Sequence, residues 1–115
     1  MLKLYAIVAV LLASACGTTP DERPVTFEFV TLAVLAPSCG QTQCHSTSTN
    51  TNGYALDTLD AARATMKSGR LTGQRLVSVL TDTGENKMPP DAPMAEEDIA
   101  LIQAWVDAGR PGLEP

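Results

Sequence analysis

The sequence predicts a small all-α domain with long loops, and three observations support this prediction. Four segments place apolar residues at the spacing of one helix face, and they span residues 26–36, 57–68, 74–80 and 96–109. Two polar stretches, 46–53 and 81–93, separate these segments and are rich in the residues typical of loops. The chain has 115 residues and no internal repeat, which leaves room for one domain.

The first 15 residues are predicted to be an export signal and not part of this domain. Lys3 precedes an apolar run that ends at Leu12, and the small residues 13–15 follow. This is the order of the basic, apolar and cleavage regions of a signal peptide. The apolar run is shorter than the roughly 20 residues that a transmembrane helix needs.

Cys16 stands directly after the small residues, so the segment resembles a bacterial lipoprotein signal. The resemblance implies that a lipidated Cys16 begins the mature protein. With Gly17 next, it also implies sorting to the outer membrane, where the domain would face the periplasm. Ordinary secretion, with cleavage near Ala15 and a free Cys16, is the alternative. Residues 16–24 carry two prolines and no periodicity, which predicts a flexible tether, and the folded domain is expected over residues 25–115.

The composition is acidic, with 8 basic and 13 acidic residues. Loss of the signal would remove Lys3 and leave a net charge of 7 − 13 = −6. This balance argues against nucleic acid or an anionic membrane surface as a partner.

The first helix is expected over residues 26–36. Its apolar positions follow helical spacing and are Phe27, Val30, Leu32, Val34 and Leu35. Several of its residues are β-branched, so a strand is a competing interpretation. Pro37 is expected to end the segment, which places Cys39 directly after it.

Two short helices are predicted in the middle of the chain. The first is capped by Asp57 or Thr58 and ends at Gly69. Its expected apolar face consists of Leu59, Ala62 and Met66. The second spans residues 74–80, and its expected apolar face consists of Leu76, Val77 and Leu80.

The last helix has the clearest signals. Its first turn is acidic, which opposes the positive end of the helix dipole, and contains Glu96, Glu97 and Asp98. Its expected apolar stripe consists of Ile99, Ile102, Trp105 and Val106. Gly109, followed by Arg110 and Pro111, is expected to end it.

The predicted domain has few large apolar side chains. Its aromatic residues are Phe27, Phe29, Tyr54 and Trp105. A domain with so small a core commonly recruits a disulfide, a metal or a cofactor. With Cys16 assigned to lipid, Cys39 and Cys44 remain as a pair. Outside the cytosol such a pair is expected to form a disulfide or two thioethers.

Residues 39–45 are the main candidate for a functional site. Cys44 directly precedes His45, which is how a c-type haem attachment site ends. In such a site the cysteines bond the haem, and the adjacent histidine can place a nitrogen on the iron. Four residues separate Cys39 from Cys44 instead of the usual two, and we expect the extra residues to bulge outward without moving Cys44 relative to His45. A small disulfide loop beside an incidental histidine is the alternative.

Zinc and cysteine-protease chemistry fit this segment less well. A tetrahedral zinc site needs four ligands, whereas the segment offers two cysteines and the single histidine of the chain. A protease thiol would need an activating base across the site in place of a second cysteine.

Because His45 is the only histidine, a second histidine ligand to iron is excluded. The remaining candidates for the second axial position are Met66, Met88 and Met94. Met66 is expected in the core of its helix, and Met94 is expected to cap or pack the last helix. Two prolines follow Met88 and stiffen its loop, which reduces the entropy lost when a ligand is held there. Met88 is therefore the predicted ligand, with simple packing in a turn as the alternative.

Three features follow one another along the chain: the helix that ends in Cys39, Cys44 and His45, the loop Lys87-Met88-Pro89-Pro90, and the closing helix with Trp105-Val106-Asp107-Ala108-Gly109. In this combination the chain resembles the small cytochrome c-like domains of environmental bacteria, the planctomycete-type cytochrome c group, over about residues 25–111. The resemblance implies about four short helices around one covalent haem c. It assigns thioether attachment to Cys39 and Cys44, the proximal iron ligand to His45, the distal ligand to Met88 and a core position near the haem to Trp105.

The function implied by this resemblance is electron transfer by a lipid-anchored protein with periplasmic redox proteins as partners and no catalytic residues. Axial positions that are both filled by protein favour electron transfer over catalysis. One alternative is a haem-free, disulfide-stabilised lipoprotein with a structural or interaction role. Another is a haem-bearing accessory of a larger redox enzyme.

Overall fold

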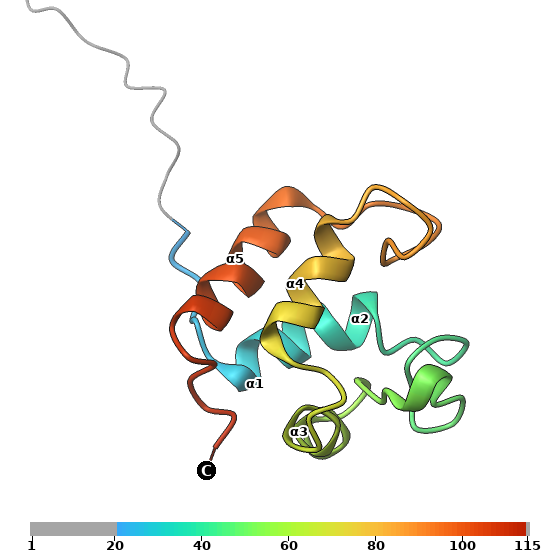
Figure 1. Ribbon diagram of the computed structural model, residues 1–115. Helices are drawn as coiled ribbons and strands as arrows, with labels where there is room; N and C mark the ends of the chain where they lie inside the picture. The colour runs from blue at the N-terminus through green and yellow to red at the C-terminus, as the bar shows by residue number, and fades with distance from the viewer. Residues whose placement is uncertain (1–20, 115) are drawn as a thin grey trace, which may run out of the picture.

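The computed structural model describes residues 21–114, which form helices joined by loops and contain no strand (Figure 1). The all-α prediction is confirmed for this part of the chain. The predicted signal at residues 1–15, the lipidation site Cys16 and most of the predicted tether lie outside the described residues. None of the helices within 21–114 has the length and apolar character needed to cross a membrane.

The first helical segment is continuous and has three parts. They are α1 (Phe27–Val30), the π-helix η1 (Thr31–Leu35) and α2 (Ala36–Ser38). Thr26 caps the segment, because its side chain accepts a hydrogen bond from the Phe29 N–H. The prediction of a helix in place of a strand is confirmed, but the helix continues past Pro37. The wider η1 turn interrupts the four-residue bonding pattern into which a proline does not fit.

The three later helices lie where they are predicted. They are α3 (Leu59–Lys67), α4 (Gly73–Thr81) and α5 (Glu96–Asp107). The side chains of Thr58 and Thr72 cap α3 and α4. Gly69 and Gly109 follow α3 and α5 with φ of 80° and 88°, a conformation that glycine adopts without strain. The predicted loop at 46–53 contains the short 3-10 helix η2 (Thr51–Gly53).

Buried residues from all the long helices form one core, in which α5 packs against both α1 and α4. Trp105 of α5 is fully buried, with its ring centroid 6.2 Å from that of Phe27. Its Nε1 donates to the Pro111 carbonyl oxygen at 3.0 Å, which holds the C-terminal segment against the core. Because α5 packs against both α1 and α4, its buried face is wider than the predicted stripe. It includes Leu101, which the prediction omitted, whereas Ile99 is only partly buried.

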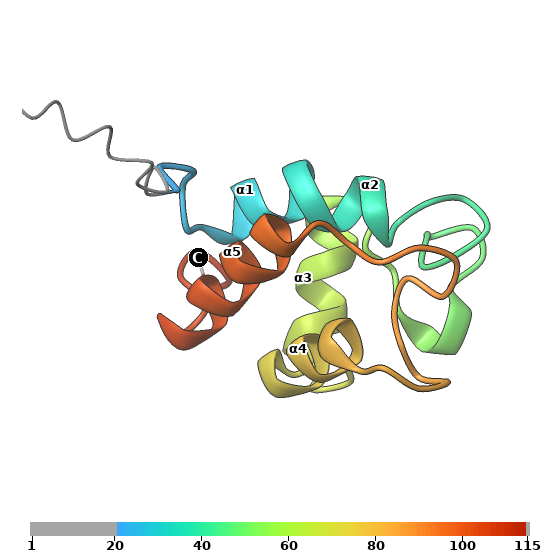
Figure 2. The ribbon, with the colours of Figure 1, turned by 90° about the horizontal axis from the view of Figure 1, so that it is seen from above.

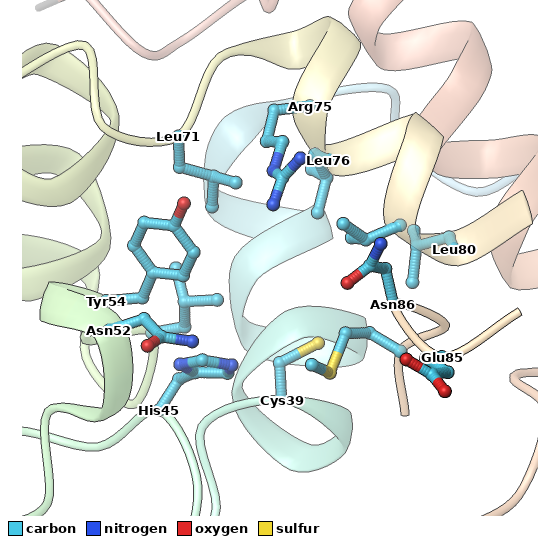
Figure 3. Close-up of a pocket in the computed structure, with 13 residues that line it drawn as sticks. Cys39, His45, Asn52, Tyr54, Leu71, Arg75, Leu76, Leu80, Glu85 and Asn86 are labelled. Atoms are coloured by element: carbon cyan, nitrogen blue, oxygen red, sulfur yellow. The ribbon is translucent and has the colours of Figure 1, made fainter. Parts of the chain in front are cut away.

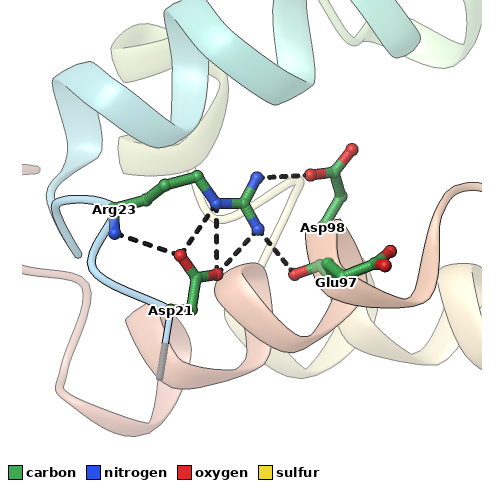
Figure 4. A network of polar contacts seen from close by, with 4 residues as sticks. All are labelled: Asp21, Arg23, Glu97 and Asp98. Carbon is green, nitrogen blue, oxygen red and sulfur yellow. Dashed lines mark hydrogen bonds and ion pairs between the residues drawn. The ribbon is translucent and has the colours of Figure 1, made fainter. Parts of the chain in front are cut away.

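Arg23 fixes the start of the described chain to α5 (Figure 4). Its guanidinium pairs with Asp98 at 2.6 Å and with Asp21 at 2.7 Å. It also donates to the Glu97 carbonyl oxygen at 2.9 Å. The last residues of the predicted tether are therefore attached to the domain.

The two long loops lie at the far end of the molecule from this attachment (Figures 1 and 2). Residues 39–57 follow α2, and residues 82–95 join α4 to α5. Both loops contribute side chains to the same two hollows. The fold thus brings together the two sequence segments that carry the predicted site residues.

Candidate functional site

Two adjoining hollows lie between the 39–57 loop and the 82–95 loop, and α4 lines one of them. The larger has a volume of about 340 Å³ (Figure 3), and the smaller has a volume of about 210 Å³. Both are lined by Cys39, His45 and Met88. Cys44, the fourth residue predicted to hold haem, lines the smaller hollow. All four predicted residues therefore lie at one site.

The larger hollow has apolar walls and a few polar groups. Its apolar lining residues are Leu56, Leu71, Leu76, Val79 and Leu80. Its polar lining residues other than His45 are Asn52, Tyr54, Arg75, Glu85 and Asn86. Such a lining, with a volume in the range of roughly 300–1,000 Å³, is typical of sites for small molecules and cofactors.

His45 is held through both its backbone and its ring. Its N–H donates to the Cys39 carbonyl oxygen at 3.0 Å, and its carbonyl oxygen accepts from the Leu56 N–H at 2.7 Å. Its Nδ1 lies 2.9 Å from the Thr51 carbonyl oxygen. The Tyr54 ring packs beside the imidazole, with 5.4 Å between the two ring centroids. Because a carbonyl oxygen only accepts hydrogen bonds, Nδ1 carries the proton in this contact. In the neutral imidazole this contact leaves Nε2 as the unprotonated nitrogen, which is the form that binds a metal.

The extra residues between the two cysteines form a surface turn. The Cys44 N–H donates to the Gln41 carbonyl oxygen at 2.8 Å, and residues 41–43 are exposed. The hydrogen bond from His45 to Cys39 closes this turn at its base. The longer spacing is therefore taken up by an outward bulge.

Gly40 determines how closely this turn approaches the rest of the domain. A Cβ at this position would lie 2.8 Å from backbone atoms of Leu56 and Asp57. Neighbouring side chains cannot relieve such a contact by rotating, because the atoms belong to the main chain. Glycine at position 40 thus allows the backbone contact between His45 and Leu56.

The two cysteines differ in their surroundings. Cys39 is half-buried, Cys44 is exposed, and both are free thiols. Burial raises the pKa of the Cys39 thiol from 9.0 to about 11, and the nearby Cys44 adds to this shift. Because the thiolate is the reactive form, Cys39 is expected to react more slowly than an ordinary thiol at neutral pH.

Met88 is placed by the backbone of its loop. Its N–H donates to the Val79 carbonyl oxygen at 2.8 Å, which joins the loop to the end of α4. The Met88–Pro89 peptide bond is cis. Met66 and Met94 are 3% and 8% exposed in the core, as expected for packing residues, and neither lines a hollow. Of the three candidate methionines, Met88 is the one that reaches the site.

Some residues occupy places that the sequence did not indicate. Trp105 packs on Phe27 and lines neither hollow, although the resemblance implied a position near the haem. Tyr54 and Arg75 line the larger hollow without having been predicted there. No local pattern marks Tyr54. The helical spacing from Arg75 to Val79, however, could have placed both residues on one face of α4.

The site residues fit a covalently attached haem. An unprotonated imidazole nitrogen and a thioether are both axial ligands that haem iron takes, and two free thiols lie next to them. Residues 21–114, these included, contain no group of three or more His, Cys, Asp and Glu side chains arranged to hold a metal ion. No family model, no curated protein and no solved structure matches this chain.

Proposed function

We propose that the protein is a lipid-anchored, periplasm-facing c-type cytochrome that carries one haem and transfers single electrons between redox proteins. One observation carries the proposal: Cys39, His45 and Met88 line the same two hollows. Met88 lies more than forty positions beyond His45 in the sequence. Only the fold brings it to the histidine and the cysteines.

Each of these residues has a chemical role in the proposal. Cys39 and Cys44 would attach the haem by thioethers, and His45 Nε2 and the Met88 sulfur would be its axial ligands. When bound, the haem supplies an iron that alternates between two oxidation states one electron apart. The Thr51 carbonyl oxygen keeps the proton on His45 Nδ1 and fixes the orientation of the ring.

The surroundings of the site support electron transfer over catalysis. Two protein ligands leave no axial position for a substrate, and a methionine ligand raises the reduction potential. The leucines of the larger hollow exclude water from its apolar wall.

The sequence supports a location in the cell envelope. The signal at residues 1–15 and Cys16 favour a lipid anchor, with the domain facing the periplasm. The net charge of −6 expected for the mature chain favours protein partners with basic docking surfaces.

The attachment is tested with exported protein produced together with a haem-maturation system. The wild type should give a haem-stained band on a denaturing gel. Cys44→Ala should retain at most one thioether, because Cys39 alone remains. The Met66→Leu variant changes a buried methionine that lines neither hollow and should stain like the wild type. A colourless wild-type band would contradict the proposal.

A haem-free, disulfide-stabilised lipoprotein is the second candidate. It is favoured by one observation, namely that Cys44 contributes to the raised pKa of Cys39 and therefore lies near it. This candidate predicts that the exported chain has a mass two hydrogen atoms below that of the reduced chain and shows no Soret absorption.

A further inference from the structure

We propose that Arg75 binds the carboxylates of the tetrapyrrole and thereby fixes the orientation of the ring in the larger hollow. This inference rests on the proposed function, since it assigns a ligand group to the same site. It adds a residue, on a different helix, that neither the attachment motif nor the methionine loop indicates.

The position of Arg75 is the first observation. Figure 3 shows its guanidinium directed into the larger hollow from the side opposite His45 and Cys39. The side chain belongs to α4, whose Leu76 and Leu80 form part of the apolar wall. The hollow therefore has thiol and imidazole groups on one side, a cation on the other, and leucines between them.

The lack of a protein partner for this cation is the second observation. Within residues 21–114, no hydrogen bond or ion pair joins the Arg75 guanidinium to another residue. By contrast, Arg23 pairs with Asp98, and Arg63 lies over the Phe27 ring at 4.8 Å. Arg75 is exposed, and Glu85, the carboxylate that lines the same hollow, forms no ion pair with it, so the guanidinium is available to an anionic ligand.

The chemistry of haem matches this arrangement. Its two vinyl groups, which form the thioethers, and its two carboxylates lie on opposite edges of the ring. If Cys39 and Cys44 hold the vinyl edge, the carboxylate edge is directed toward the other side of the hollow. A guanidinium there can donate two parallel hydrogen bonds to a carboxylate.

The other polar residues of the hollow also favour a position of the haem carboxylates beside Arg75. Figure 3 shows the Asn86 amide also pointing into the hollow, where it can donate a further hydrogen bond. Tyr54 is less available, because its hydroxyl donates to the Arg70 carbonyl oxygen at 3.1 Å. Glu85 supplies the single carboxylate of this lining and would repel the ligand carboxylates, so they are favoured beside Arg75.

The test compares three variants of the holoprotein. Arg75→Gln removes the cation, and Arg75→Lys restores it without the forked geometry. Lys67→Gln is the matched control, because it also removes one positive charge but from a surface pair with Glu114 outside the hollow. The reduction potential of each protein is measured by optical titration between about pH 5 and pH 9.

We expect Arg75→Gln to lower the reduction potential, because a nearby cation favours the reduced iron, which carries less positive charge. Its potential should also fall with rising pH as carboxylates that are no longer paired lose their protons. The wild type should show a weaker pH dependence. Arg75→Lys should recover part of the lost potential, and Lys67→Gln should match the wild type. The Glu85 carboxylate is present in all four proteins, so its effect on the reduction potential cancels when they are compared.

The inference is overturned if Arg75→Gln and Lys67→Gln have the same potential and the same pH profile while both bind haem. A wild-type protein that attaches no haem would overturn the proposed function and this inference together. The two failures are distinguished by the colour of the wild type.

Discussion

Replacement of Gly40 by alanine tests how the 39–45 turn is positioned. The added Cβ would lie 2.8 Å from three backbone atoms of Leu56 and Asp57. The 39–45 turn is joined to the backbone at Leu56 by the hydrogen bond from the Leu56 N–H to the His45 carbonyl oxygen. The substitution must therefore separate the backbone segments that hold the histidine.

The size of the effect follows from the cost of overpacking. An extra carbon that forces backbone movement costs about 1–3 kcal/mol. With a urea slope near 2 kcal/mol/M, a loss of 2 kcal/mol would lower the unfolding midpoint by roughly 1 M. Trp105 is the only tryptophan and is fully buried, so its fluorescence reports the unfolding of the core.

Gly84→Ala is the matched control for Gly40→Ala. Its added Cβ would meet only the Asp82 carboxylate oxygen, at an ordinary contact distance of 3.5 Å. Its stability should change by less than about 1 kcal/mol, because alanine also restricts the unfolded chain. Equal urea midpoints for the two variants would refute the backbone contact at Gly40.

Three further predictions concern the proposed ligand, the thiols and an acidic side chain. Met88→Ala should keep the covalent haem but change the absorption spectrum of the reduced protein to that of iron with a weaker axial ligand. Met94→Ala should keep the wild-type spectrum and lose about 2–5 kcal/mol of stability, because it truncates a buried side chain. A changed spectrum in Met94→Ala and an unchanged one in Met88→Ala would make Met94 the ligand. In haem-free, reduced full-length protein at pH 8, iodoacetamide should alkylate Cys44 before Cys39, because Cys39 is half-buried and its pKa is raised to about 11. Mass spectrometry of the peptides measures the alkylation rate at each cysteine, and equal rates would contradict this prediction. Hydrogen bonds from the Thr47 backbone and side chain lower the pKa of Asp57 below 3.8. Its contribution to stability is therefore present above pH 3.8 and lost as the pH falls through the lowered pKa. Asp57→Asn should therefore lose less stability than the wild type as the pH falls, measured as the midpoint of thermal unfolding at each pH. Identical pH profiles for the two proteins would contradict this prediction.

The helices could be predicted because their signals are local. Thr58 and Gly69 lie at the two ends of α3, and Gly109 follows α5, so each boundary is set by residues next to it. The buried face of α5 was less predictable. It depends on α1 and α4, which pack against it from two sides, and the sequence of α5 alone contains no information about its neighbours.

The site was predictable only in part, for a related reason. The adjacency of Cys44 and His45 and the prolines after Met88 are visible in the sequence. The Thr51 carbonyl that holds the His45 ring is a backbone group that every residue has, so no residue type marks it. The role of Gly40 likewise appears only when the chain folds back at Leu56.

The most direct test of the central claim is the intact mass of the wild-type protein, exported from cells that contain a haem-maturation system. The proposal predicts a chain heavier by one covalently bound haem, with Soret absorption that remains after denaturation. A colourless chain whose mass is two hydrogen atoms below that of the reduced form would contradict it and would support a disulfide between Cys39 and Cys44.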